Sequence, residues 1–218
     1  MSGLLMKDLE LIKINMKTYL AVFLIGLIYL VAHENGSTFF VAYAIFVSIG
    51  VSVGTISYDG YHHGMRFLMT LPITKEQYVQ SKYLLSFCFA VLVSAASLLL
   101  GIIRIQISGN QKVEDLLIST GVALVISGII LCGMIPLRLK YEAEKSRIVM
   151  VAVVAVIFLV AAACKKLYDV YRESFGKGLQ FLSTLSGGQI AIILIIVIAI
   201  CIAASMKVSE RIMEGKEF

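Results

Sequence analysis

The chain has 218 residues, of which 59% are hydrophobic and only 15% are charged, and its formal net charge is +5. A soluble domain is about half apolar and about a quarter charged, so this composition excludes an ordinary soluble protein. The charges are clustered between long apolar runs, as expected for membrane spans joined by loops. The positive excess suits contact with anionic lipid headgroups, and nothing in the pattern favours nucleic-acid binding.

The first predicted element is a helix at the membrane surface, formed by residues 4–17. Apolar residues recur there at helical spacing and the charges fall elsewhere, which is typical of an interfacial helix. The apolar face comprises Leu5, Leu9, Ile12 and Met16, and the charges elsewhere are Lys7, Asp8, Lys13 and Lys17.

The apolar runs that follow predict six transmembrane α-helices in a single domain that covers residues 1–218. Most of the runs approach the roughly 20 residues that a helix needs to cross a bilayer. They are continuous, not alternating, which favours helices over a barrel. The expected fold class is all-α, a polytopic membrane protein. The predicted spans are 19–32, 38–58, 83–107, 116–137, 148–164 and 190–206.

Lysine and arginine counts predict that both termini are cytoplasmic, because the loops on that side hold more of these residues. The outer loop 165–188 is an exception to this charge pattern, since it contains Lys165, Lys166, Arg172 and Lys177. Apolar residues at helical spacing predict that part of this loop lies on the membrane surface.

Small residues mark one face of the second predicted span. Gly50 and Gly54 are four residues apart, with Ser48 and Ser52 alongside, which favours close helix packing over a pore lining. The four cysteines fall within or at the end of apolar runs and match no metal or redox spacing, so we interpret them as small packing residues. They are Cys88, Cys132, Cys164 and Cys201.

The polar segment 59–82 separates the second and third spans. Pro72 disfavours a helical conformation at Leu71, and Thr74 with Gln77 three residues later predicts a capping box, so a new helix should begin at Lys75. The result is a short elbow at the membrane surface, with Leu71 and Ile73 exposed at its tip. Such residues suit docking into a partner's groove, and the alternative is a plain interfacial turn.

Three segments resemble the bacterial two-component ATP-binding-cassette (ABC) exporters, in which a small six-span permease is encoded apart from its ATPase. Residues 4–9 are similar to the family's N-terminal helix. Residues 70–79, continued by 81–83, are similar to its loop of Ser-Leu-Pro, a hydrophobic residue and Ser or Thr. Residues 144–147 resemble its second cytoplasmic loop, although Glu142 stands where glycine is expected, so the turn of that loop should differ.

The resemblance implies a permease in the bacterial cell membrane that pairs with a second permease, identical or related, and with a cassette ATPase that binds ATP and Mg²⁺. This chain would hold no catalytic residue, cofactor or metal. Family members export peptides, bacteriocins or toxic amphiphiles, including phenol-soluble modulins, so a membrane-active peptide is the expected kind of substrate. The expected coupling residues are Leu71, Pro72, Ile73, Thr74, Glu76, Gln77 and Tyr78, with Glu144, Lys145 and Arg147 in the second cytoplasmic loop.

Two other motifs are interpreted as structural. Residues 185–189 spell Leu-Ser-Gly-Gly-Gln, the signature of cassette ATPases, but no Gly-x-x-x-x-Gly-Lys-Ser/Thr loop accompanies it. Ser186 and its glycines therefore predict a helix start. His62 and His63 near Asp59 favour a hydrated loop over a metal site, because adjacent residues on a helix point about 100° apart.

A second hypothesis belongs to another class of protein, a membrane immunity or assembly protein that acts without an ATPase. Such a protein would protect cells equally well after every ATPase subunit is deleted. An intramembrane enzyme and a proton- or sodium-driven transporter are disfavoured, because the predicted spans hold almost no ionisable residues.

Overall fold

The computed structural model describes residues 2–34, 36–60, 64–109, 111–141 and 187–216. These residues form seven helices and no strand, which confirms the all-α fold class. The helices are α1 (Ser2–Ile14), α2 (Met16–Ala32), α3 (Gly36–Gly60), α4 (Gly64–Thr70), α5 (Lys75–Ser108), α6 (Val113–Lys140) and α9 (Gly187–Glu214).

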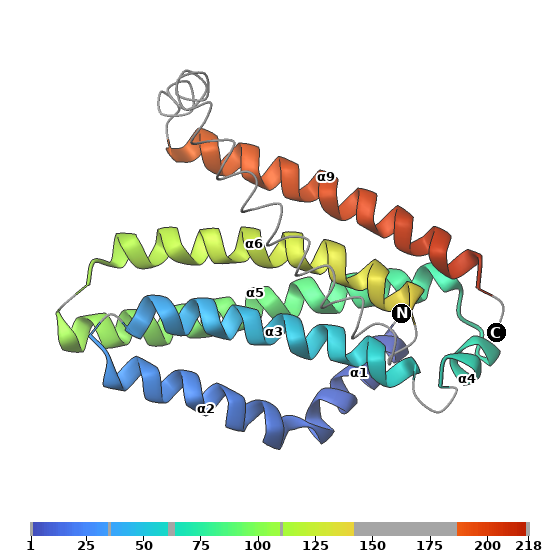
Figure 1. The fold of residues 1–218 in the computed structure, drawn as a ribbon, viewed down its shortest axis with the longest axis horizontal. Helices are drawn as coiled ribbons and strands as arrows, with labels where there is room; N and C mark the ends of the chain where they lie inside the picture. The colour runs from blue at the N-terminus through green and yellow to red at the C-terminus, as the bar shows by residue number, and fades with distance from the viewer. Residues whose placement is uncertain (1, 35, 61–63, 110, 142–186, 217–218) are drawn as a thin grey trace, which may run out of the picture.

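The long helices form a bundle in which α3, α5 and α6 run side by side at the centre (Figure 1). Helix α2 lies against α3, and α9 lies against α6 and α5. Both marked chain ends lie at the same end of the bundle as α1 and α4. We call this the terminal end, defined by α1, α4 and residues 71–78. The opposite, distal end holds the α2–α3 and α5–α6 connections.

Three of the described helices, α3, α5 and α6, are long and apolar enough to cross a membrane. Helices α1 and α2 together pass the same test as a pair bent by 66°. The chain is therefore a multi-pass membrane protein. The predicted span 148–164 lies outside the described residues, and 190–206 lies within α9.

The helices are longer than the predicted spans. Helix α6 continues past Pro136 for another turn, where we expected the span to end. Its last turn carries Arg138 and Lys140, whose positive charges suit the negative end of a helix dipole. At the distal end, the Arg104 guanidinium donates hydrogen bonds to the Leu30 and Val31 carbonyl oxygens, both 3.2 Å away, instead of reaching only towards the membrane interface.

The interior contains two separate apolar clusters. The larger lies towards the terminal end and the smaller towards the distal end. The larger comprises Leu4, Ile49, Val53, Ile56, Leu68, Tyr78, Val79, Tyr83, Leu131, Ile135, Leu139 and Met213. The smaller comprises Leu30, Phe40, Val41, Ile45, Ile105 and Leu116.

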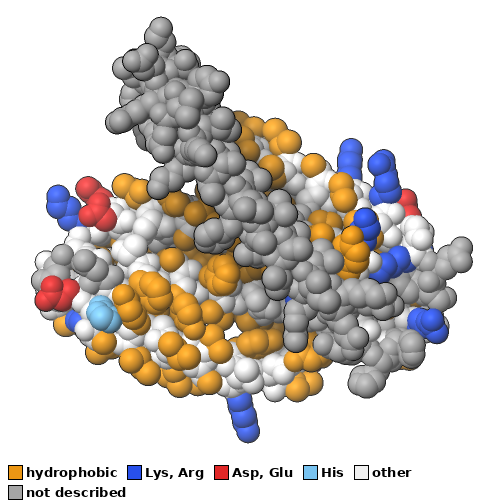
Figure 2. Space-filling view, in the orientation of Figure 1, with side chains coloured by type: hydrophobic (Ala, Val, Ile, Leu, Met, Phe, Trp, Pro, Cys, Tyr) orange, Lys and Arg blue, Asp and Glu red, His pale blue; other side chains and the backbone are white. Residues whose placement is uncertain are grey.

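Large apolar side chains also cover the outside of the bundle, whereas most of the basic and acidic side chains on the visible face lie towards its ends (Figure 2). This arrangement matches a surface that faces lipid. It also corrects our interpretation of Cys88 as a packing residue, because its side chain is exposed on α5. Cys132 and Cys201 are half-buried, and all three are free thiols. Cys164 lies outside the described residues.

Gly50 makes no close helix contact within the described part of the chain. Gly50 is exposed, and a Cβ atom there would meet nothing within 4 Å. Ser48 and Ser52 are buried instead, because residues two apart on a helix point about 200° apart and cannot share a face. Gly54 lies nearer a neighbour, because a Cβ atom at this position would lie 3.7 Å from the Tyr19 hydroxyl.

Candidate functional site

The predicted elbow is present at the terminal end. Helix α4 ends at Thr70, residues 71–74 turn the chain, and α5 begins at Lys75 as expected. The capping box is confirmed: the Thr74 hydroxyl accepts a hydrogen bond from the Gln77 backbone N–H at 3.1 Å. The Gln77 side-chain oxygen accepts one from the Thr74 N–H at 3.3 Å. These bonds satisfy two helix N–H groups that would otherwise lack partners, so they fix where α5 starts.

Apolar side chains are exposed on this elbow. The Leu71 side chain is 42% exposed and Phe67, on α4, is 69% exposed. Pro72 and Glu76 are exposed as well. The expectation for Ile73 is wrong, because its side chain is half-buried and packs against the larger apolar cluster. One face of the elbow is therefore anchored in the bundle, and the other is available to a partner.

Tyr78 turns inward, although it was grouped with the coupling residues. Its side chain is fully buried, and its hydroxyl donates a hydrogen bond to Asp59 Oδ2 at 2.9 Å. Asp59 is the second-last residue of α3. The first turn of α5 is thus bonded directly to the end of α3.

Four charged side chains meet beneath the elbow. The Lys82 ammonium lies 2.7 Å from both carboxylate oxygens of Asp8 on α1 and 2.7 Å from Asp59 Oδ2 on α3. Lys7 binds Asp59 Oδ1 and lies 3.2 Å from Asp8 Oδ1. The Thr55 hydroxyl is 3.4 Å from the Lys82 ammonium. We call Lys7, Asp8, Asp59 and Lys82 the charge cluster.

The charge cluster is buried but electrically balanced. Lys82 is 1% exposed, Asp8 is 0% exposed and Asp59 is 5% exposed, while Lys7 retains 30%. Two lysines and two aspartates cancel in charge, which limits the cost of removing them from water. Ionisable residues in membrane helices are rare and mark functional sites. The cluster joins α1, α3 and α5 at one point, because Lys7 and Asp8 belong to α1, Asp59 to α3 and Lys82 to α5.

The cluster corrects one expectation from the sequence. Asp8 was placed on the solvent side of the first helix, but it is fully buried. Leu9 is 47% exposed on α1, which is compatible with the lipid-facing side of an interfacial helix, and Met16 lies beyond the bend, on α2. Asp8 turns inward because Lys82 provides it with a partner of opposite charge inside the bundle, and Asp59 does the same for Lys7.

The C-terminal helix α9 is hydrogen-bonded to the start of α5 as well. The Lys75 ammonium donates hydrogen bonds to the backbone oxygens of Glu214, at 3.2 Å, and Lys216, at 2.8 Å. Further along α5, the Tyr83 hydroxyl lies 2.5 Å from Ser205 Oγ and 2.9 Å from Ser209 Oγ. The start of α5 is consequently bonded to α1, α3 and α9.

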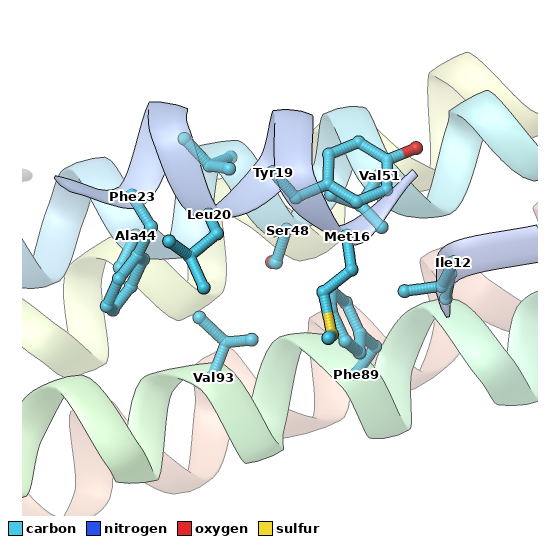
Figure 3. A pocket seen from close by; sticks show the side chains of 11 residues that line it. Ile12, Met16, Tyr19, Leu20, Phe23, Ala44, Ser48, Val51, Phe89 and Val93 are labelled. Carbon is cyan, nitrogen blue, oxygen red and sulfur yellow. The ribbon is translucent and has the colours of Figure 1, made fainter. Parts of the chain in front are cut away.

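An apolar cavity of about 330 Å³ lies under the bend between α1 and α2. Side chains from α2 and α5 point towards each other across it, with Leu20 facing Val93 and Met16 reaching towards Phe89 (Figure 3). Helix α3 forms its rear wall. The lining residues are Ile12, Met16, Tyr19, Leu20, Phe23, Ala44, Val47, Ser48, Val51, Phe89 and Val93. The Ser48 hydroxyl already donates to the Ile45 carbonyl at 2.6 Å, so the wall offers little to a polar ligand.

Several predicted site residues lie outside the part of the chain that the structure describes. Glu142, Glu144, Lys145, Arg147 and Ser186 lie outside the described residues, as do His62 and His63. Helix α9 begins at Gly187, next to the expected cap. Among the residues that the structure describes, no group of histidine, cysteine, aspartate and glutamate could hold a metal ion.

The sequence reasoning missed the roles of Lys7, Asp8, Thr55, Asp59 and Lys82 at this site. One signal was available, because Asp59 and Lys82 are opposite charges at facing ends of two neighbouring apolar runs. Asp8 carried a similar signal, since it follows Leu4 by four residues and so shares its helix face.

Comparison with known proteins places the chain in a family. It matches no curated protein and no solved structure. The family model described as "ABC-2 family transporter protein" matches residues 3–214, which is nearly the whole chain. The matched region contains the elbow, the charge cluster and the cavity. The chain therefore belongs to the ABC-2 transporter family and is a transmembrane subunit of an ABC transporter that works with an ABC ATPase subunit.

Proposed function

We propose that the chain is the permease of an ATP-driven exporter and that its separate ATPase docks on residues 71–78. One observation carries the proposal: the elbow exposes Leu71 and Phe67 on one side and is fixed to the bundle on the other by Ile73 and Tyr78. An exposed apolar tip provides a contact for a partner. The packed side, formed by Ile73 and Tyr78, allows that partner's movement to be transmitted to the membrane helices.

The terminal end faces the cytoplasm of a bacterial cell in this proposal. Basic residues at this end support that orientation, because lysine and arginine are enriched on the cytoplasmic side of membrane proteins. They include Lys13, Arg66, Lys75, Lys207 and Arg211. ATP and Mg²⁺ bind the ATPase, and a second permease, identical or related, completes the transporter.

The substrate in this proposal is hydrophobic or amphipathic, such as a membrane-active peptide. The apolar cavity beneath the α1–α2 bend supports this choice, because its walls suit an aliphatic or aromatic group and provide almost no partners for a polar one. The charge cluster does not favour a transported ion, since its charges already cancel.

The first prediction tests the docking. We expect Leu71→Asp to weaken capture of the ATPase by the tagged permease by about thirtyfold, the scale of an interface hot spot, because a carboxylate would have to be buried at the contact. Membrane insertion should be normal. The matched control is Ile107→Asp, which alters an exposed apolar residue at the distal end of α5. Equal capture by both variants would contradict the proposal.

A genetic measurement distinguishes the exporter from the alternative, an immunity protein that acts without an ATPase. We expect resistance to the toxic substrate to disappear when the ATPase subunit is deleted and the permease is retained. Full resistance in that strain would support the alternative.

The second prediction tests the cavity. Val93→Trp should lower transport of an amphipathic substrate by about tenfold, because the indole fills the space between α2 and α5. ATPase capture should not change, since the elbow is untouched. Val91→Trp is the matched control, because Val91 lies on the same helix and is 57% exposed. Transport assays in vesicles that contain permease and ATPase would compare the two, and equal rates would exclude the cavity from the substrate path.

A further inference from the structure

We infer that the Asp8–Lys82 ion pair makes α1 a moving part of the transporter, which follows α5 when the elbow is displaced. This inference rests on the proposed function, because it assigns a second output to the same elbow. The alternative is that α1 is a passive anchor on the membrane surface.

The position of Lys82 supports the inference. Lys82 lies seven residues after Lys75, which is two helical turns from the elbow on a continuous helix. A helix of this kind moves as a rigid rod over such a distance. The Lys82 ammonium binds both Asp8 carboxylate oxygens at 2.7 Å, so a displacement of α5 acts directly on α1.

The other charged contact of α1 with the bundle is the Lys7–Asp59 pair, which joins it to α3 and not to α5. Among its described side chains, only Leu4 and Asp8 are buried. Leu4 packs in the larger apolar cluster, and apolar contacts of this kind can slide. The ion pair is shielded from water and cannot be replaced by hydration without opening the bundle. Asp8 is therefore the point at which α1 is held to α5.

Movement of α1 would displace residues that line the cavity. The bend of 66° between α1 and α2 is centred on Asn15, whose side-chain amide donates to the Leu11 carbonyl at 3.0 Å. Ile12 of α1 and Met16 of α2 both line the cavity. A shift of α1 relative to α3 thus changes the shape of the cavity wall, which links the ATPase contact to the proposed substrate site.

The charge cluster can be divided without leaving a net charge. Asp8→Asn with Lys82→Met removes the α1–α5 pair, and Lys7 and Asp59 remain as a balanced pair with the Tyr78 hydroxyl bonded to Asp59. This double variant is the test. Its control is Glu10→Gln with Lys13→Met, which removes an ion pair on the exposed side of the same helix. The Glu10 side chain is 55% exposed and the Lys13 side chain is 66% exposed.

The experiment compares hydrogen exchange of the full permease–ATPase complex in lipid, without nucleotide and after trapping with ATP and vanadate. In the native and control complexes, we expect trapping to change exchange both at residues 71–78 and in α1. In the double variant, the change at residues 71–78 should persist and the change in α1 should become much smaller, with only the indirect link from Lys7 through Asp59 to Tyr78 remaining. Transport should fall by about tenfold, the scale of a typical coupling between two sites.

Three outcomes decide the inference. An unchanged α1 response in the double variant overturns it, because α1 would then not be driven through this pair. Absence of any α1 response in the native complex overturns it as well. If the double variant does not fold, Asp8→Asn alone, which keeps the shape of the side chain, must reduce the α1 response for the inference to stand. Failure of the proposed function is distinct, since the native permease would then not capture an ATPase.

Discussion

Lys82→Met is expected to be the most destabilising single substitution at the terminal end. It leaves the carboxylates of Asp8 and Asp59 buried with only Lys7 to balance them. Removing one partner of a buried ion pair costs about 3–5 kcal/mol, because an uncompensated charge remains in a medium of low polarity. We therefore expect a lower unfolding temperature and less folded permease in the membrane.

A second substitution tests the physical reason. Adding Asp8→Asn to Lys82→Met restores charge balance, so the double variant should be more stable than Lys82→Met alone. Thermal unfolding of the purified chains in the same detergent provides the comparison. Lys13→Met is the control, because Lys13 is exposed and its pair with Glu10 contributes little. If the double variant unfolds at a lower temperature than the single one, charge imbalance is not the cause.

Local features of this chain were predictable from the sequence because each depends on neighbouring residues. Thr74 and Gln77 form their capping box within one helical turn, so the start of α5 follows from four residues. The bounds of α2, α3 and α6 lie within three residues of the predicted apolar runs, and the C-terminal end of α5 lies one residue past its run, whereas α5 starts eight residues before its run. The exposure of Leu71 followed from the same local geometry.

The charge cluster could not be predicted in the same way, because its members lie far apart in the chain. Lys82 and Asp8 are separated by 74 residues, and Lys7 and Asp59 by 52. Hydrophobic periodicity assigns charged residues to the polar face of a helix, and this rule fails where opposite charges neutralise one another inside a bundle. The inward orientation of Tyr78 has the same origin, since its partner Asp59 belongs to another helix.

The glycines illustrate a second limit. Spacing alone singled out Gly50, whereas the close approaches occur at glycines whose neighbours come from other segments. At Gly26, a Cβ atom would lie 2.7 Å from the Tyr43 ring, and at Gly36 it would lie 2.7 Å from the Tyr29 carbonyl oxygen. Which face of α3 meets α2 depends on how the two helices pack, and the sequence pattern contains no information about that contact.

Gly36→Ala should strongly destabilise the distal end of the bundle. A Cβ atom at Gly36 would meet three backbone atoms of α2, the Tyr29 carbonyl oxygen at 2.7 Å and the Leu30 Cα and carbonyl oxygen at 2.9 Å. Backbone atoms cannot rotate aside as a side chain can, so the turn between α2 and α3 must open. Overpacking of this kind costs about 1–3 kcal/mol, and the rigid neighbours place this site towards the upper limit.

Gly50→Ala provides the matched control on the same helix, because a Cβ atom there meets nothing within 4 Å. We expect the unfolding temperature of Gly36→Ala to fall well below that of Gly50→Ala, which should equal or slightly exceed the native value because alanine favours the helix more than glycine does. Capture of the ATPase by folded Gly36→Ala should be retained, because the turn between α2 and α3 lies at the opposite end of the bundle from the elbow between α4 and α5. Equal stability of the two variants would show that α2 can move away from α3 without loss, and α2 would then be free to shift with α1.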